Sequence, residues 1–189
     1  MKIIREPLPG LFVIKPNVYK DERGFFLETW QHERFKEIGI NKEFVQDNWS
    51  RSSKDVLRGL HFQLKHPQGK LVSVRRGAIY DVAVDIRENS ETFGQWHGEV
   101  LSDENHLQIY IPPGFAHGFS VLSDIVDFNY KCTEYYHPDD EGGILWNDSD
   151  LKIHWKIEHP VVSEKDQKLL PFSELKLSDD LQPILQCMV

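Results

Sequence analysis

A histidine and a lysine lie close together in the stretch VLRGLHFQLKHPQGKLVSVRR, residues 56–76. The imidazole of His61 is a possible base, because histidine accepts a proton near neutral pH. The ammonium of Lys70 is a possible partner for the negative charge that develops when a proton is removed. Most histidines and lysines at strand ends have no chemical role, so spacing alone leaves a purely structural pair as the alternative.

The segments on either side of this pair have the pattern of β-strands. Val, Leu and Phe alternate with other residues in Val56–Phe62 and again in Leu71–Val74. The connection between them, residues 65–69, contains a proline and a glycine, which are typical of a turn. We therefore expect a hairpin in which His61 and Lys70 meet against an apolar wall.

Short β-rich runs dominate the rest of the chain. They are bounded by Gly, Pro, Asn, Asp or Ser and recur about every 8–12 residues, which is typical of a sandwich or barrel. Short helices are expected over Gln31–Ile38, closed by Gly39, and after Ser163. The predicted strands are Leu11–Tyr19, Gly24–Trp30, Glu43–Asn48, Val56–Phe62, Gly69–Arg76, Ala78–Ile86, Trp96–Leu101, Gln108–Ile111, Phe115–Leu122 and Ile125–Cys132.

Size and composition indicate a globular protein. The 189 residues suit one domain, 1–189, in which residues 176–189 are expected to form a mobile C-terminal tail. The net charge of −8 and the absence of a basic block argue against nucleic acid as a partner. The chain contains no apolar run suited to a secretory signal or a membrane span, and its two cysteines form no CxxC pattern. We therefore expect a reduced, cytoplasmic protein.

The run IPPGFAHGF, residues 111–119, has the form PxGxxH on a predicted strand. It resembles the second motif of cupins, so the expected fold class is mainly β, a cupin-type jelly-roll barrel or sandwich with a few short helices. Metal-binding cupins carry a first motif of HxH followed by Glu. Here His61 is followed by Phe62 and Gln63, and no Glu occurs before Arg76. Two histidines and an amide are a poor ligand set for a transition metal, so we expect neither a metal nor another cofactor.

Ten short motifs resemble, in order, those of the dTDP-4-dehydrorhamnose 3,5-epimerases. The resemblance implies that the substrate is dTDP-4-dehydro-6-deoxy-D-glucose, which is inverted at carbons 3 and 5 to give dTDP-4-dehydro-L-rhamnose for dTDP-L-rhamnose synthesis. The motifs are DERGFF, FVQDNWSRS, LRGLHFQ, QGKLV, DVAVDIR, FGQW, PxGFAHGF, NYKCTEYY, ILWND and SEKD, which span residues 21–166.

Other functions share part of this pattern. An epimerase that acts at a single carbon in another dTDP-deoxysugar pathway would keep the barrel and the base. A metal-dependent cupin oxygenase would need a ligand at Gln63. A non-catalytic nucleotide-sugar-binding cupin would keep the binding residues but would not need His61, Asp166 and Tyr130 together.

The resemblance assigns four catalytic residues. Carbons 3 and 5 both neighbour the carbon 4 ketone, so the reaction requires a base, a partner for the enolate oxygen and an acid on the opposite face. His61 matches the base and Lys70 the enolate partner. Asp166 matches the carboxylate that orients the base, although SEKD, residues 163–166, also resembles a helix capping box. Tyr130 matches the acid, although its strand pattern also suits a core tyrosine.

The resemblance also implies binding residues and a dimer. The forked guanidinium groups of arginines suit a diphosphate, and the ring of Tyr136 matches one that stacks on thymine. Simple alternation places Arg58 on the strand face opposite His61, unless Gly59 bulges the strand or the Arg58 side chain departs from the simple pattern, and the sequence does not decide between these. Family members are homodimers in which strands near the N-terminus cross to the partner and contribute to its pocket. The implied contact residues are Arg23, Glu28, Gln46, Asp47, Asn48, Arg58, Lys70, His117, Tyr136, Glu141 and Lys165, of which Arg23 and Glu28 would act in the neighbour's pocket.

Overall fold

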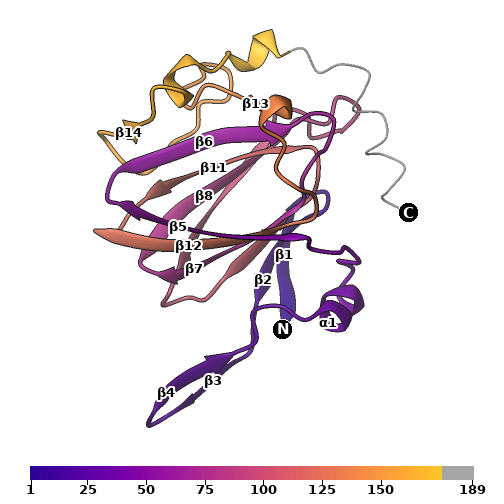
Figure 1. Cartoon of the computed structure of the whole chain (residues 1–189), viewed down its shortest axis with the longest axis vertical. Helices are drawn as coiled ribbons and strands as arrows, with labels where there is room; N and C mark the ends of the chain where they lie inside the picture. The colour runs from indigo at the N-terminus through magenta and orange to yellow at the C-terminus, as the bar shows by residue number, and fades with distance from the viewer. Residues whose placement is uncertain (176–189) are drawn as a thin grey trace.

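The computed structural model of the protein describes residues 1–175, and the predicted tail, residues 176–189, lies outside the described residues. Two antiparallel sheets face each other and form the body of the molecule (Figure 1). The first sheet has the order β1 (Lys2–Leu8), β2 (Leu11–Lys15), β10 (Gln108–Ile111), β7 (Lys70–Arg76), β12 (Ile125–Cys132) and β5 (Gln46–Ser53).

The second sheet has the order β13 (Glu141–Gly143), β6 (Val56–Gln63), β11 (Phe115–Val121), β8 (Ala78–Asp85) and β9 (Trp96–Ser102). A short strand, β14 (Val161–Val162), pairs in parallel with β6. The remaining elements are the hairpin β3 (Val18–Asp21) and β4 (Gly24–Leu27), the helix α1 (His32–Glu37), and the 3₁₀ turns η1 (Pro138–Asp140), η2 (Asp166–Lys168) and η3 (Phe172–Glu174). The predicted mainly β sandwich with few short helices is confirmed.

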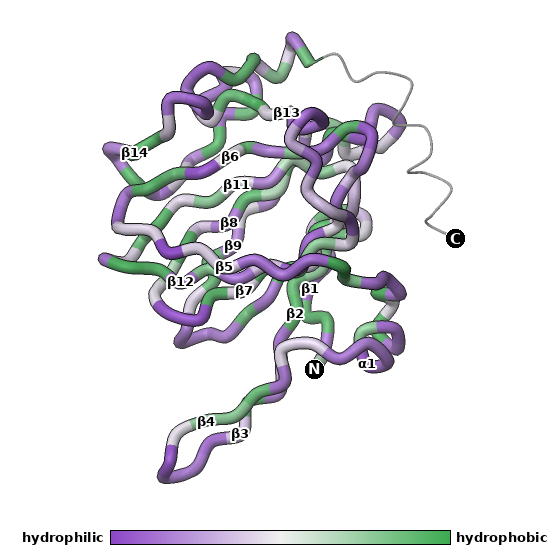
Figure 2. The backbone as a smooth tube through the Cα atoms, in the orientation of Figure 1, coloured by the Kyte–Doolittle hydropathy of each residue, from purple (hydrophilic) through white to green (hydrophobic). Residues whose placement is uncertain are grey.

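The main core lies between the two sheets because alternate side chains of each strand point inward. Val72 and Val74 of β7, for example, belong to one buried cluster with Phe119 of β11 and Phe128 of β12. Figure 2 shows a hydrophobic inner strand such as β2, whereas β5, at the edge of the first sheet, is largely hydrophilic. Burial of this apolar surface holds the two sheets at a fixed distance. The packed sheets in turn position the polar side chains that project into the space between them.

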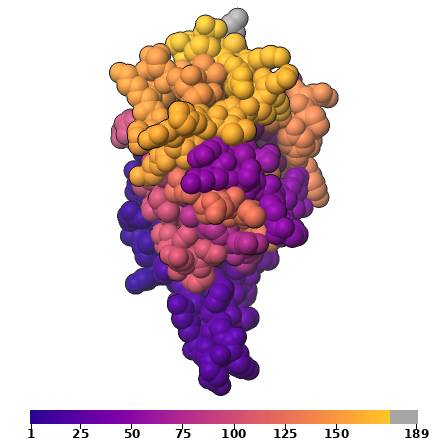
Figure 3. All heavy atoms as spheres, turned by 90° about the vertical axis from the view of Figure 1, so that its left-hand side faces the viewer, coloured from indigo at the N-terminus to yellow at the C-terminus, as the bar shows by residue number. Residues whose placement is uncertain are grey.

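The outer face of each sheet is also covered. The segment after β13 packs Leu151 and Trp155 against Leu57 and Tyr80 of the second sheet. Phe35 of α1 packs with residues of the first sheet. The hairpin β3–β4 instead projects from the body of the molecule (Figures 1 and 3). No helix within residues 1–175 is long and apolar enough to cross a membrane.

The expected hairpin of His61 and Lys70 is wrong. The strands that carry them, β6 and β7, belong to different sheets, and β7 pairs with β10 and β12 instead. The alternation of apolar residues fixes which faces of a strand are buried, but it does not fix which strand lies beside it. The connection of residues 64–69 therefore crosses from one sheet to the other.

Other differences from the predicted elements are smaller. The predicted strand Leu11–Tyr19 is divided into β2 and β3 around Pro16, which cannot donate a backbone hydrogen bond. The strand β1 was not predicted, and the strand expected over Glu43–Asn48 instead spans Gln46–Ser53. The helix over Gln31–Ile38 is confirmed as α1, whereas the segment after Ser163 forms only the 3₁₀ turn η2.

A bulge in β6 resolves the orientation of Arg58. His61 pairs with His117 of β11, whereas Arg58 pairs with Phe119, so β6 contains one more residue than its partner in this interval. Gly59, at the bulge, has a φ of +107°, a conformation that suits glycine. The extra residue returns Arg58 to the same side of the strand as His61, and both line one cavity.

Candidate active site

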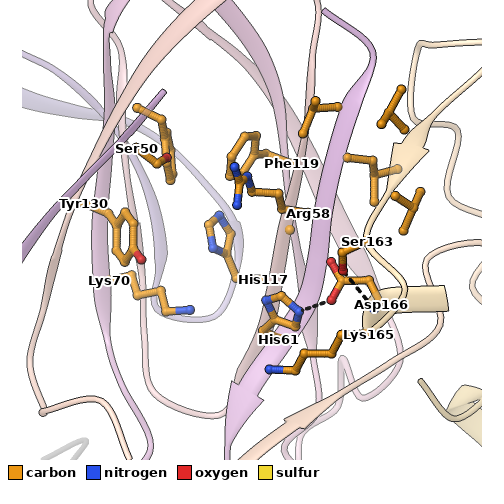
Figure 4. Close-up of a pocket in the computed structure, with 16 residues that line it drawn as sticks. Ser50, Arg58, His61, Lys70, His117, Phe119, Tyr130, Ser163, Lys165 and Asp166 are labelled. Atoms are coloured by element: carbon orange, nitrogen blue, oxygen red, sulfur yellow. Dashed lines mark hydrogen bonds and ion pairs between the residues drawn. The ribbon is translucent and has the colours of Figure 1, made fainter. Parts of the chain in front are cut away.

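Two adjoining cavities open at one end of the sandwich. The larger has a volume of about 510 Å³ and the smaller about 310 Å³. His61, Lys70 and Tyr130 line both cavities. His61 comes from the second sheet, and Lys70 and Tyr130 come from the first, so a molecule bound here would have groups on both sides. Figure 4 shows these side chains pointing into the space between the sheets.

His61 is held by a buried carboxylate. Its Nε2 lies 2.7 Å from Oδ1 of Asp166 (Figure 4). Oδ2 of the same carboxylate accepts a hydrogen bond of 3.2 Å from the backbone N–H of Gly59. Asp166 is 3% exposed, so its orientation is fixed by its surroundings. Because Asp166 occupies Nε2, the other ring nitrogen, Nδ1, is the one left to accept a proton.

The Asp166 carboxylate remains charged despite its burial. Burial raises the pKa of Asp166, but the hydrogen bond and charge of His61, together with hydrogen bonds from Gly59 and Ser163, outweigh it and lower the pKa below its usual value. Half of the predicted capping box is present, since the backbone N–H of Asp166 donates to Oγ of Ser163 over 3.1 Å. The carboxylate itself points away from the turn to His61, as the resemblance implied.

A second carboxylate faces the Nδ1 side of the imidazole. Oε1 of Glu141 lies 3.9 Å from Nδ1 of His61. Its Oε2 accepts a hydrogen bond of 2.6 Å from the hydroxyl of Tyr136 and forms an ion pair with the ammonium of Lys165. Burial raises the pKa of Glu141, but the hydrogen bonds from Lys165 and Tyr136 and the charge of His61 outweigh it and lower the pKa.

Lys70 and Tyr130 form the opposite wall. Burial lowers the pKa of the Lys70 ammonium, although the charges of Asp81 and Glu141 act in the other direction. Burial raises the pKa of Tyr130, so the phenol keeps its proton at neutral pH. The Tyr130 ring packs on Phe128 with a centroid distance of 5.4 Å, which fixes its direction. Tyr130 is thus partly buried, packs against the core cluster and also lines the cavity.

His117 takes part in a second buried histidine–carboxylate pair. Its Nε2 lies 2.8 Å from Oδ2 of Asp81 on the neighbouring strand β8, and both residues are buried. His117 was an expected contact residue and it lines the larger cavity, but Asp81 was not predicted. The signal available in the sequence was an aspartate in the middle of the apolar run AIYDVAV, residues 78–84, where a charge requires a partner.

Polar side chains supply the remaining lining. Arg58 lines the larger cavity, and its Nε donates to Oγ of Ser52 over 3.2 Å. In the smaller cavity, the amide of Gln46 donates to Asn48 over 3.0 Å and accepts the backbone N–H of Tyr136 over 2.9 Å. These amides and the Tyr136 ring form a polar, aromatic pocket that suits a nucleobase.

Three expected contact residues lie elsewhere in this chain. Asp47 alternates with Gln46 and Asn48 on β5 and forms an ion pair with Lys131 instead of lining the two cavities. Arg23 belongs to the projecting hairpin β3–β4, where it pairs with Asp21. Glu28, just after β4, pairs with Arg34 of α1 over 2.8 Å.

Gln63, which stands where a metal-binding cupin has its second histidine, has a structural role. Its amide nitrogen donates to the carbonyls of His66 and Tyr135, over 2.7 and 3.1 Å, and its oxygen accepts the N–H of His137 over 2.8 Å. All three contacts fasten loops at the rim of the smaller cavity. Within residues 1–175, no three His, Cys, Asp or Glu side chains are grouped to hold a metal ion.

The fold and the cavity define a class of protein. A jelly-roll sandwich holds an oriented imidazole on one sheet and a protonated phenol on the other, with a poorly solvated ammonium beside the phenol. This arrangement suits removal of a proton from one face of a bound carbonyl compound, stabilisation of the enolate and return of a proton on the other face. Such a site belongs to a racemase or epimerase.

Comparisons with known proteins identify the family. A family model described as dTDP-4-dehydrorhamnose 3,5-epimerase matches residues 5–174, and the chain belongs to this family. The chain is 53% identical to a dTDP-4-dehydrorhamnose 3,5-epimerase of Methanothermobacter thermautotrophicus over 92% of this chain and 95% of the relative. A Legionella pneumophila dTDP-6-deoxy-D-glucose-3,5-epimerase, solved in complex with dTDP-4-keto-L-rhamnose, is 52% identical with a TM-score of 0.90, covering 93% and 94% of the two chains.

A more distant structure has the same fold. The 3'-monoepimerase of Streptomyces bikiniensis, solved with dTDP, has a TM-score of 0.86 at 27% identity and covers 100% of this chain and 98% of its own. The expected cupin-type jelly roll is therefore confirmed. The same fold occurs in relatives named as 3,5-epimerases and in one named as a 3'-monoepimerase, so the fold does not decide how many carbons are inverted.

Proposed function

We propose that the protein inverts carbons 3 and 5 of dTDP-4-dehydro-6-deoxy-D-glucose and so forms dTDP-4-dehydro-L-rhamnose for dTDP-L-rhamnose synthesis. The observation that carries this proposal is the placement of His61, held by Asp166, on one sheet and Tyr130 on the facing sheet. Inversion requires proton removal and proton return on opposite faces of the same carbon.

In the proposed mechanism, Nδ1 of His61 takes the proton from a carbon next to the carbon 4 ketone. The electron pair moves into the ketone, and the ammonium of Lys70 stabilises the oxygen of the enolate. The phenol of Tyr130 then donates its proton to the opposite face of the same carbon. Asp166 keeps Nε2 protonated and stabilises the imidazolium. The same groups act on carbon 3 and carbon 5 because both carbons neighbour one ketone.

The proposed binding mode follows the charges of the cavities. Arg58 and Lys165, which line the larger cavity, bind the diphosphate. The amides of Gln46 and Asn48 and the ring of Tyr136, which line the smaller cavity, bind the thymidine. His117, held by Asp81, contacts the sugar. The proposed chemistry uses only these side chains and requires no metal or other cofactor.

The proposal includes a homodimer in which the projecting hairpin completes the neighbour's site. Arg23 at the hairpin tip has an 83% exposed side chain, and Phe25 and Phe26 beside it are 58% and 68% exposed. Large exposed aromatic side chains of this kind are typical of a contact surface. Arg23 and Glu28 would then act in the partner's cavity. Because the proposed substrate is a nucleotide sugar, the proposed location is the cytoplasm.

Incubation with the dTDP-keto sugar in D₂O tests the proposed reaction. We expect deuterium at both carbon 3 and carbon 5 and a product with both centres inverted, measured by NMR. His61→Ala should abolish nearly all turnover, a loss of about 10²–10⁴-fold, because no other group is assigned to remove the proton. Activity of His61→Ala within about threefold of wild type would overturn the assignment of the base.

Inversion at one carbon is the second candidate, favoured by the likeness to the Streptomyces bikiniensis 3'-monoepimerase. The same experiment distinguishes the two. Deuterium and inversion confined to one of the two carbons would support the single epimerase, and incorporation at both with double inversion would exclude it.

A further inference from the structure

The imidazole of His61 lies between two carboxylates, one near each ring nitrogen. Nε2 lies 2.7 Å from Asp166, and Nδ1 lies 3.9 Å from Glu141. Glu141 comes from β13, which pairs with β6 so that Glu141 is opposite Gln63. The proposed function gives the transferred proton to Nδ1. Glu141 therefore faces the nitrogen on which positive charge develops during the reaction.

The charge of Glu141 is already shared with another partner. Its Oε2 forms an ion pair with the ammonium of Lys165 and accepts a hydrogen bond from Tyr136. The Lys165 side chain is 59% exposed, whereas that of Glu141 is 12% exposed. An exposed ion pair is weak and easily exchanged, so Lys165 is the partner that can leave. The buried carboxylate stays next to His61.

Lys165 has a second possible counter-ion. It lines the larger cavity together with Arg58, in the space that the proposed function assigns to the diphosphate. A diphosphate carries more negative charge than a carboxylate and offers several acceptor oxygens to an ammonium. A bound nucleoside diphosphate therefore competes with Glu141 for Lys165.

We propose that the diphosphate of the substrate draws Lys165 away from Glu141 and so frees this carboxylate to stabilise the protonated imidazole of His61. This inference rests on the proposed function. The base would then gain strength only after substrate has bound, and Glu141 acts as a positioning residue through His61. The proton passes from the substrate carbon to Nδ1, the imidazole becomes a cation, and Glu141 remains an anion throughout.

The other charged and titratable groups around His61 make contacts other than an ion pair with Glu141. Lys70 of β7, His117 of β11 and Tyr130 of β12 lie in the walls of the two cavities, and Arg58 bonds Ser52. The smaller cavity adds the thiol of Cys132, whose pKa is raised by burial, and the phenol of Tyr136, whose pKa is raised by its hydrogen bond to Glu141. Both groups remain neutral at neutral pH.

Proton uptake on binding of dTDP, without the sugar, tests the proposal directly. Calorimetry in two buffers of different ionisation enthalpy measures the protons taken up near pH 6.5. Wild type should take up about half a proton or more, because the binding of an anion that frees Glu141 favours protonated His61. Glu141→Gln should lose most of this uptake. In Lys165→Met the carboxylate is free before binding, so the uptake should also fall.

Matched controls lie on the same turn. Glu164→Gln and Lys168→Met remove the same charges from exposed residues that line neither cavity, and both should keep the wild-type uptake. Uptake in Glu141→Gln equal to that in wild type would overturn the proposal, because the charge of the diphosphate alone would then account for it.

The pH dependence of turnover provides the second measurement. The profile of kcat/KM reports the free enzyme and that of kcat reports the complex. The acid limb of wild-type kcat should lie about 0.5–1 pH unit above that of kcat/KM, and this gap should vanish in Glu141→Gln. A gap that persists in the variant contradicts the inference. Failure of the proposed function is distinct, since wild type would then not form the doubly inverted sugar, and the calorimetric comparison with dTDP would still decide the coupling.

Discussion

At the scale of single residues, the Asp166 carboxylate makes two contacts that a neutral amide cannot both keep. One oxygen binds Nε2 of His61 and the other accepts the N–H of Gly59. In Asp166→Asn, the amide oxygen can still accept the N–H of Gly59, but the amide NH₂ then faces Nε2 of His61. Nε2 must accept this hydrogen bond, so the proton of the neutral imidazole moves to Nδ1. The base is then blocked, and we expect kcat to fall by about 10³–10⁴-fold with the fold intact by circular dichroism. A variant within about threefold of wild type would show that the pair only supports the structure.

The same substitution has a pH-dependent effect on stability. The pKa of Asp166 is lowered in the folded protein from its usual value of 3.8. Its charge therefore stabilises the fold fully above that usual value, and the contribution disappears as the pH falls through the lowered pKa. Urea unfolding should show wild type more stable than Asp166→Asn at pH 7, with the difference closing below about pH 4. A difference that stays constant with pH would contradict the contribution of this charge.

Tyr130→Phe separates proton removal from inversion. The phenylalanine ring keeps the packing on Phe128, so the melting temperature should change little. His61 still removes a proton and Lys70 still stabilises the enolate, so some exchange of solvent deuterium at carbon 3 or carbon 5 should persist. The inverted product should fall by about 10²-fold or more, because the opposite face has lost its acid. NMR of the product measures both quantities, and inversion at the wild-type rate would move the acid to another residue.

The sequence predicted some residues of this site correctly but could not decide the contacts of others. The motifs around His61, Lys70 and Tyr130 predicted side chains that the structure places in one cavity. The sequence SEKD suits both a cap and a partner of the base, and only the tertiary structure shows the carboxylate pointing to His61. The resemblance implied Asp47 as a contact residue, but strand alternation turns its side chain away from those of Gln46 and Asn48, and it pairs with Lys131.

At the scale of the elements, the bulge in β6 aligns Arg58 with His61. A Cβ atom on Gly59 would lie 2.6 Å from both the Cα of Gly118 and the carbonyl oxygen of His117, and the φ of +107° is unfavourable for alanine. Gly59→Ala should therefore destabilise the protein by about 2–4 kcal/mol and lower kcat as well, because the bulge also donates to Asp166. Chemical denaturation and steady-state kinetics measure the two effects.

Gly24→Ala is a matched control for this prediction. Gly24 has a φ of +128°, but a Cβ atom there would meet nothing within 4 Å. It should cost only the strain of the backbone, about 1 kcal/mol. If both variants are equally stable, close packing at the bulge is not what holds β6 in register.

The sequence predicts where most strands lie in the chain, but it does not predict which strands pair with each other. Most strand ranges follow from local alternation and turn residues, and the sandwich follows from their number. The partner of each strand depends on contacts between residues far apart in the sequence, such as β7 with β12. For that reason the pair His61 and Lys70 was predicted to meet across a hairpin, whereas it meets across the space between two sheets.

At the scale of the whole molecule, the hairpin β3–β4 forms a separate two-stranded sheet that projects from the body (Figure 3). Tyr19 and Phe26 remain 61% and 68% exposed on it, and Arg23 pairs only with Asp21 of the same hairpin among residues 1–175. The cavities meanwhile contain Arg58 but not Arg23. An isologous dimer that exchanges the hairpins would cover the aromatic side chains and bring a second arginine to each cavity.

Mixed dimers test this exchange. Arg23→Ala and His61→Ala should each be nearly inactive alone, one through lost substrate binding and the other through the lost base. After joint refolding, about half of the dimers should be hybrids of the two variants. In each hybrid, one cavity combines the native His61 of one chain with the native Arg23 of the other, and the second cavity lacks both. The mixture should therefore recover about a quarter of wild-type activity. If Arg23 acted in its own chain's cavity, each hybrid would have two defective sites and the mixture would remain inactive. A mixture of His61→Ala with Asp166→Asn, whose residues share one cavity within a chain, is the matched negative control and should recover no activity.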